Sequence, residues 1–224
     1  HWVYLLDLLE TFLSLYPDEF RNACLLRNDY TFYDNWNILR PFRQRYILSD
    51  GTVRLKDTVR PDPEKQRLIT ARPHQPHTVR INHGAADIVY RTNLLVKMVI
   101  LALNKLCSFD PLVTGLEMDA GRPGWCDAIN GLPGVLGASV SEVFALKRLL
   151  EQIRLISGWL ASDAAIVVPA EVGRFFEAWN SCWEEPPVST EACFKFWEQT
   201  HEVRDAFLAE IRLGLDGREV EISL

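Results

Sequence analysis

Residues 139–160 read SVSEVFALKRLLEQIRLISGWL, and this stretch decides the fold class. Ser139 and Glu142 stand three positions apart ahead of an apolar run. This spacing is typical of a capping box, in which each of the two side chains satisfies a backbone amide at the start of a helix. Apolar residues then recur at helical spacing as far as Leu160. The stretch therefore predicts a long helix that begins next to Ser139.

Four other stretches have helical patterns, at residues 2–16, 87–107, 170–183 and 190–213. The second is apolar nearly all round, which indicates a helix buried inside a larger helical assembly. The first is also largely apolar and is stopped by Pro17. The last residues, 217–224, alternate like a strand. Together these patterns predict an all-α fold, in which helix pairs pack around a shared core and loops at one end carry the chemistry.

Residues 28–83 have a different pattern, with short mixed stretches such as RYIL, TVRL and RLIT broken by prolines and by Asp50-Gly51. This pattern predicts a long, partly β excursion with one or two hairpins. Residues 40–80 include eight Arg and two Lys but only three Asp and one Glu. Such an excess of positive charge could draw phosphate toward a cleft. The ordinary interpretation is a solvated loop whose arginines pair with neighbouring acids.

Composition and charge predict a globular protein and disfavour several kinds of partner. A hydrophobic content of 48% predicts a sizeable core, and the net charge of −6 disfavours a nucleic-acid partner. The most apolar stretch, residues 94–106, is too short to cross a bilayer, so we expect no membrane partner. Five cysteines form no Cys-x-x-Cys pair and leave one over, which indicates neither a zinc site nor a closed disulfide framework. We expect a cytoplasmic protein without a metal or organic cofactor.

The helical pattern is already running at Trp2, so we expect the chain to be a fragment of a longer polypeptide and to be inactive in isolation. The sequence leaves its oligomeric state open.

Half of the glycines fall in one segment, residues 115–137, which reads GLEMDAGRPGWCDAINGLPGVLG. Glycine lets the backbone approach a ligand closely, and proline stiffens the chain, so the segment predicts a shaped and rigid loop. We interpret it as the active-site loop. Trp125 has a flat apolar face suited to stacking on a sugar ring.

Asp127 follows two residues after this tryptophan. A carboxyl group between an indole and packed backbone has its pKa raised by desolvation, which would let it act as a general acid. The residue types alone favour a simpler role, a turn or cap aspartate before a short helical turn.

The motif around these residues resembles the catalytic-domain core of β-glucoside phosphorylases of glycoside hydrolase family 94, and the 1,2-β-oligoglucan phosphorylase branch most. The resemblance rests on GRPGWCDAINGLPGVLGASVSEVFALKRLL, on the preceding YRTNLLVKMVILALNKL and on LEMDAG. It extends over about residues 1–160 and is sharpest at 115–150. In that family the loop reads Asp-Trp-Asn-Asp, followed by a short spacer and Asn, and its second Asp is the proton donor. Trp125, Asp127 and Asn130 match this arrangement. Gly124 and Cys126 replace the first Asp and the Asn.

The resemblance implies a fragment of one (α/α)6-barrel domain that spans residues 1–224. It implies inverting phosphorolysis of β-linked gluco-oligosaccharides, β-1,2-glucan oligomers among them, to α-glucose 1-phosphate. Inorganic phosphate would be the co-substrate and an oligosaccharide the substrate. Because phosphate itself attacks the anomeric carbon, one carboxylic acid suffices.

The roles implied in this way are general acid for Asp127, sugar platform for Trp125 and loop shaping for Asn130. Polar contacts to the sugar are expected from Arg122, Glu117 and Asp119, and either of the two acids could instead serve as a second carboxylate. Two alternatives stay open. One is an inverting β-glucan hydrolase on the same barrel, and the other is a catalytically inactive carbohydrate-binding helical domain.

Overall fold

Long apolar helices form the framework of the structure, which is a computed structural model. It describes residues 2–49, 51–55, 57–81, 88–117, 138–160, 165–183 and 187–223. The helices are α1 (Trp2–Leu15), α2 (Pro17–Arg21), α3 (Pro63–Thr70), α4 (Leu94–Leu106), α5 (Val140–Ser157), α6 (Ala170–Cys182) and α7 (Thr190–Glu210), with the π-helix η1 (Asn22–Leu26) and the 3-10 helix η2 (Phe42–Gln44). The strands pair antiparallel in twos: β1 (Asn37–Leu39) with β4 (Val59–Pro61), β2 (Tyr46–Ser49) with β3 (Thr52–Leu55), β5 (Leu116–Glu117) with β6 (Ala138–Ser139), and β7 (Ile166–Pro169) with β8 (Glu219–Ile222).

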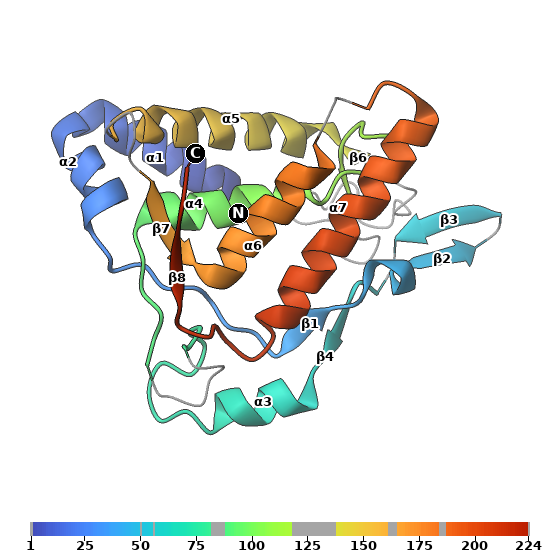
Figure 1. Cartoon of the computed structure of the whole chain (residues 1–224), viewed down its shortest axis with the longest axis horizontal. Coiled ribbons are helices and arrows are strands. Elements are labelled where there is room, and N and C mark those ends of the chain that lie inside the picture. The colour runs from blue at the N-terminus through green and yellow to red at the C-terminus, as the bar shows by residue number, and fades with distance from the viewer. Residues whose placement is uncertain are drawn as a thin grey trace.

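Helix α4 lies at the centre of the apolar core. It packs against α5 on one side and α6 on another, while α1 packs against α5 and α6 against α7. Figure 1 shows α5 along the top of the molecule, with α4 below it and with α6 and α7 crossing at an angle. Leu95 and Val96 on α4 are fully buried. The prediction of a buried helix in this region is therefore confirmed.

The start of α5 confirms half of the predicted capping box. Ser139 Oγ accepts a hydrogen bond from the backbone amide of Glu142 at 3.3 Å. The carboxylate of Glu142 does not return to Ser139, because it binds Lys105 Nζ on α4 at 2.7 Å. The helix ends at Ser157, three residues before the predicted end. The same acid thus ties the beginning of α5 to the end of α4.

The predicted start of α4 at residue 87 was wrong. The described residues from Ile88 onward are extended, and isolated bridges join Val89 to Arg80 and Thr92 to Tyr30. Asn93 then caps the helix, its side chain accepting from the amide of Val96 at 2.9 Å. Residues 88–92, which precede this cap, are therefore extended and pair with distant backbone, and the helix begins only after Asn93.

The excursion of residues 28–83 contains the β2–β3 hairpin and the β1–β4 pair, as predicted, but it also contains helix α3. The stretch RLIT forms the second half of α3, so its assignment as a strand was wrong. Asp62 accepts from the amides of Glu64 and Lys65, and Pro63 fills the first helical position. An Asp cap followed by Pro is a start signal that outweighs the local β pattern.

Ion pairs fasten this excursion to α7. Arg43 Nη2 lies 2.7 Å from Glu198 and 2.8 Å from Glu202, and Arg45 Nη2 lies 2.6 Å from Asp205. For these two arginines the ordinary interpretation, pairing with acids, is confirmed. Figure 1 shows the β2–β3 hairpin projecting beyond α7.

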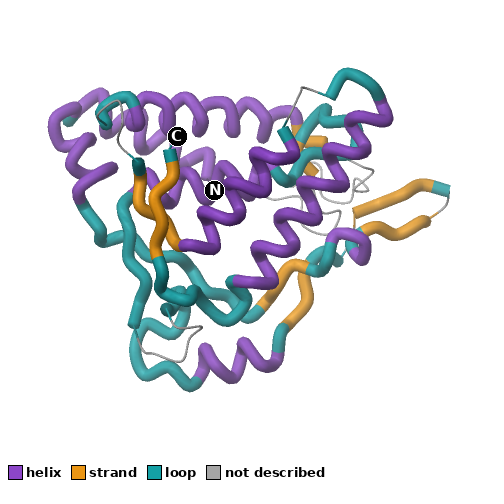
Figure 2. The backbone as a smooth tube through the Cα atoms, in the orientation of Figure 1, coloured by secondary structure: helices purple, strands orange, loops and turns teal. Residues whose placement is uncertain are grey.

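The chain end forms the predicted strand. β8 pairs with β7, and Val220 lies opposite Val168 in this pair. Both strands pack against α6. Figure 2 shows this pair and the smaller β5–β6 pair outside the excursion. The prediction of an all-α fold needs correction, because the structure is mainly helical with several small sheets.

Candidate functional site

The two ends of the Gly/Pro segment meet in a short antiparallel pair. Leu116 pairs with Ser139, and Glu117 pairs with Ala138. This β5–β6 pair leads directly into α5, so both ends of the predicted active-site loop are fixed next to the α4–α5 packing. Residues 118–137 lie outside the described residues. The site predictions for Asp119, Arg122, Trp125, Asp127 and Asn130 fall within this range, and Glu117 is the one predicted site residue that the structure places.

A buried aspartate shapes the turn that enters β5. The carboxylate of Asp110 accepts hydrogen bonds from the backbone amides of Thr114 at 2.6 Å and Gly115 at 2.8 Å. It also accepts from the amide of Leu112 at 3.2 Å. An aspartate that satisfies three amides of its own turn fixes the path of the backbone. This turn therefore sets the position of Glu117, two residues after Gly115.

Three donors from other elements hold the Glu117 carboxylate. His201 Nε2 on α7 lies 3.0 Å from Oε2, and Trp197 Nε1, one turn earlier on α7, donates to Oε1 at 2.9 Å. The hydroxyl of Tyr46 on β2 also donates to Oε1. The side chain of Glu117 is 6% exposed and that of His201 is 0% exposed. One carboxylate thus joins β5, α7 and β2 in the interior.

Both ring nitrogens of His201 have partners in the interior. Its Nδ1 lies 2.9 Å from the backbone oxygen of Trp197, while its Nε2 faces the carboxylate of Glu117. Each ring nitrogen therefore faces an acceptor, so the imidazole lies between the backbone of α7 and the carboxylate on β5. A buried carboxylate needs several donors, and Trp197 and Tyr46 supply two more for Glu117.

The electrostatic environment keeps Glu117 ionised. Burial alone would raise the pKa of this carboxyl, but hydrogen bonds and charge from His201, with the further hydrogen bonds from Tyr46 and Trp197, lower it overall. Burial and the negative charge of Glu117 raise the pKa of Tyr46, so its hydroxyl stays a donor. A carboxylate that is ionised and fully occupied by donors holds the start of the loop in place.

His201 and Trp197 were not among the predicted site residues, although both contact Glu117. Their spacing of four residues puts both side chains on one face of α7, and this was the signal in the sequence. Their partner stands 84 residues earlier in the chain, so periodicity alone could not reveal the contact.

A cavity of about 350 Å³ opens beside Glu117. We call it the loop-base cavity. Its polar lining includes Arg45, Asn104, Lys105, Ser108, Glu117 and Arg204. Arg45 is only 2% exposed and binds Asp205, and its Nε also donates to the backbone oxygen of Arg40 at 2.8 Å. The cavity combines three cationic side chains with hydroxyl and amide groups, a lining suited to a small polar or anionic ligand.

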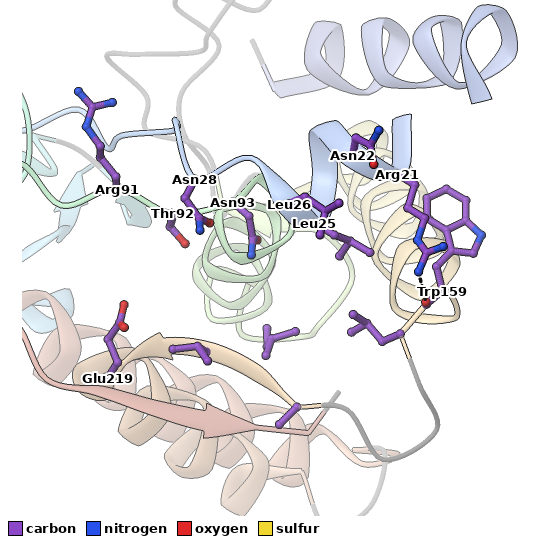
Figure 3. A pocket seen from close by; sticks show the side chains of 14 residues that line it. Arg21, Asn22, Leu25, Leu26, Asn28, Arg91, Thr92, Asn93, Trp159 and Glu219 are labelled. Carbon is purple, nitrogen blue, oxygen red and sulfur yellow. Dashed lines mark hydrogen bonds between the residues drawn. The ribbon is translucent and has the colours of Figure 1, made fainter. Parts of the chain in front are cut away.

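A larger hollow of about 900 Å³ lies between η1, the residues before α4 and the β7–β8 pair. Figure 3 shows Arg21 extending along this wall toward Trp159, whose backbone oxygen accepts from its Nη2 at 3.4 Å. The other polar side chains of the hollow also have partners within the protein. Arg91 donates to the backbone oxygen of Asp29 at 3.3 Å, and Asn93 caps α4. Glu219 accepts from the hydroxyl of Tyr90 at 3.5 Å. These side chains stabilise the walls, so we place the candidate site at the loop base.

Among the described residues, no cluster of three or more His, Cys, Asp or Glu side chains could hold a metal ion. No helix within the described ranges has both the length and the apolar character needed to cross a membrane. The chain matches no protein-family model, and no curated protein or solved structure is significantly similar to it.

Proposed function

We propose that the chain is part of the catalytic domain of a phosphorylase that acts on β-linked gluco-oligosaccharides, 1,2-linked oligomers in particular. We further propose that its helices belong to an (α/α)6 barrel. The observation that carries the proposal is the order Trp125-Cys126-Asp127 with Asn130, within a Gly/Pro-rich loop that leads into the helix beginning at Val140.

Asp127 is the general acid in this proposal. Its proton passes to the glycosidic oxygen as the bond from that oxygen to the anomeric carbon breaks. A phosphate oxygen forms a bond to the same carbon from the opposite face, which inverts the anomeric configuration and gives α-glucose 1-phosphate. Trp125 stacks on the sugar ring, and Asn130 holds the shape of the loop. Asp119 and Arg122 supply hydrogen bonds to sugar hydroxyls.

Two structural features support this proposal. The β5–β6 pair brings the ends of the loop together, and Glu117 at one end is held by His201 and Trp197. A catalytic carboxyl group has to be held close to its productive position, which requires a supporting shell of this kind. The mainly helical framework, in which α4 packs against α5 and α6, is compatible with helix pairs of a barrel.

The test is product analysis with the complete polypeptide that carries this sequence. β-1,2-Gluco-oligosaccharides are incubated with and without inorganic phosphate, and the products are followed by ³¹P and ¹H NMR. The proposal predicts α-glucose 1-phosphate, formed only when phosphate is present. Release of free glucose at a rate independent of phosphate would assign the loop to an inverting hydrolase. Saturable binding of the oligosaccharide without any product would assign it to an inactive binding domain.

A further inference from the structure

Helices α6 and α7 pack side by side, and a groove of about 380 Å³ lies between them (Figure 1). Every residue that lines it belongs to one of these two helices and falls within the described ranges. We call it the α6–α7 groove. It shares no lining residue with the loop-base cavity. A ligand bound in this groove would therefore leave that cavity open.

The floor of the groove is apolar. Phe175 on α6 and Phe207 on α7 stack nearly parallel, with 4.3 Å between their ring centroids, and both rings are buried. Val203 and Ala206 on α7 also line the groove, next to these rings in the chain fold. Such a floor favours the alkyl part of a ligand, because binding removes apolar surface of both partners from water.

Acidic side chains stand at both ends of this floor. Glu171 in the first turn of α6 and Glu210 at the end of α7 lie at one end, and Glu202 lies at the other. Glu202 and Glu210 are eight residues apart on α7, which is about 12 Å along the helix axis. Arg174 is the one cation in this described lining, and it binds Glu210. The lining therefore favours a ligand that carries positive charge at two separated points.

Glu171 has an unused acceptor in the interior. The residue is 1% exposed, and its Oε1 accepts from the backbone amide of Asp216 at 2.7 Å. Its Oε2 has no hydrogen-bond partner among the residues that the structure describes. A buried carboxylate oxygen without a donor is unfavourable, so a ligand that brings N–H donors to it is stabilised there. An ammonium group carries such donors together with the opposite charge.

We propose that the α6–α7 groove binds a linear aliphatic diamine, with one ammonium at Glu171, the other at Glu202 and the alkyl chain on the apolar floor. Charge complementarity selects this class of ligand. An inorganic cation lacks the alkyl chain, and an alkylamine with one amino group lacks the second charge. The inference goes beyond the proposed phosphorolysis and does not depend on it. The two proposals can therefore fail separately, because this one is tested by binding and the other by turnover.

The experiment is isothermal titration calorimetry of the complete polypeptide with 1,8-diaminooctane, whose extended chain has a span similar to the separation of the acidic ends. We expect saturable binding at one site. Octylamine and 1,4-diaminobutane cannot reach both ends, so each should bind more weakly by about tenfold or more, the effect of one lost charge-assisted hydrogen bond. Magnesium chloride should give no comparable binding.

Two variants test the two parts of the groove. Glu171→Gln removes the charge but keeps an acceptor for the Asp216 amide, and it should weaken binding of 1,8-diaminooctane by about tenfold or more. Its control is Glu177→Gln, at an exposed position of α6 outside the lining. Ala206→Trp places an indole over the floor from an exposed position of α7 and should abolish binding. Its control is Ala209→Trp, which is also exposed on α7 but lies outside the lining.

The proposal is overturned if the wild type does not bind 1,8-diaminooctane, or if octylamine or magnesium chloride binds equally well. Wild-type affinity in Ala206→Trp would also overturn it, since the groove would then not be the site. Wild-type affinity in Glu171→Gln would remove the assigned ammonium partner. Should Glu171→Gln fail to fold, Ala206→Trp and its control decide the question, because the substituted side chain is exposed.

Discussion

Glu117 Oε2 lies 3.0 Å from His201 Nε2, although 84 residues separate the two in the chain. Glu117 lies near the start of the Gly/Pro segment and is the last described residue before position 118, and His201 stands in the middle of α7. The contact therefore ties the entrance of the proposed catalytic loop to a helix that packs against another part of the core. In the proposed function, His201 would be a positioning residue, because it contacts the loop residue Glu117.

Glu117→Gln tests this anchor. The substitution removes the charge that faces His201, and we expect a loss of about 1–3 kcal/mol in the free energy of unfolding at pH 7. The pKa of Glu117 is lowered in the folded state, so its contribution is fully present above about pH 4.3 and is lost as the pH falls through the folded-state value. Urea unfolding across this range should show a weaker acid dependence in the variant. The control is Glu151→Gln, at an exposed pair with Lys147. Equal acid dependence in wild type and Glu117→Gln would contradict the assignment.

Neighbouring arginines of the excursion should differ sharply in their effect on stability. Arg45 is buried and its partner Asp205 is mostly buried, whereas Arg43 and its two glutamates are exposed. Asp205→Asn leaves the charge of Arg45 uncompensated and should cost about 3 kcal/mol. Arg43→Met should change the free energy of unfolding much less, because water screens an exposed pair. Denaturant titration of the two variants gives the comparison, and equal losses would show that burial does not decide the effect.

Gly173 on α6 is needed for close packing against β8. A Cβ atom at this position would lie 2.5 Å from Val220 Cγ2, well inside van der Waals contact. Gly173→Ala should therefore destabilise the protein by about 1–3 kcal/mol. Adding Val220→Ala should recover part of this loss. At the control position, Gly158, a Cβ would be 3.4 Å from its nearest neighbours, so alanine should be tolerated there. Thermal unfolding of the single and double variants checks the coupling, and strictly additive effects would refute it.

Local signals in the sequence were enough to predict much of the framework. Helix α5 follows from Ser139 and the apolar spacing after it, and β8 follows from strict alternation. Helix α3 was missed because its start depends on Asp62 and Pro63, while the four residues at its end look like a strand. The start of α4 was placed too early because residues 88–92 form backbone bridges to distant segments, which periodicity does not reveal.

The candidate site was predictable only in part. The density of glycine and proline identified the loop, and Glu117 was named within it. The partners of Glu117 come from β2 and α7. Such relations depend on how distant segments pack. They follow from the fold and leave no pattern in the sequence near either residue.

The central claim is that a single carboxylic acid at position 127 protonates the departing glycosidic oxygen. Asp127→Asn in the complete polypeptide tests it most directly, with sugar phosphate release and oligosaccharide binding measured on the same preparation. We predict a loss of turnover of roughly a hundredfold to ten-thousandfold, while the affinity for β-1,2-gluco-oligosaccharides stays close to that of the wild type. Turnover at the wild-type rate in Asp127→Asn would contradict the claim.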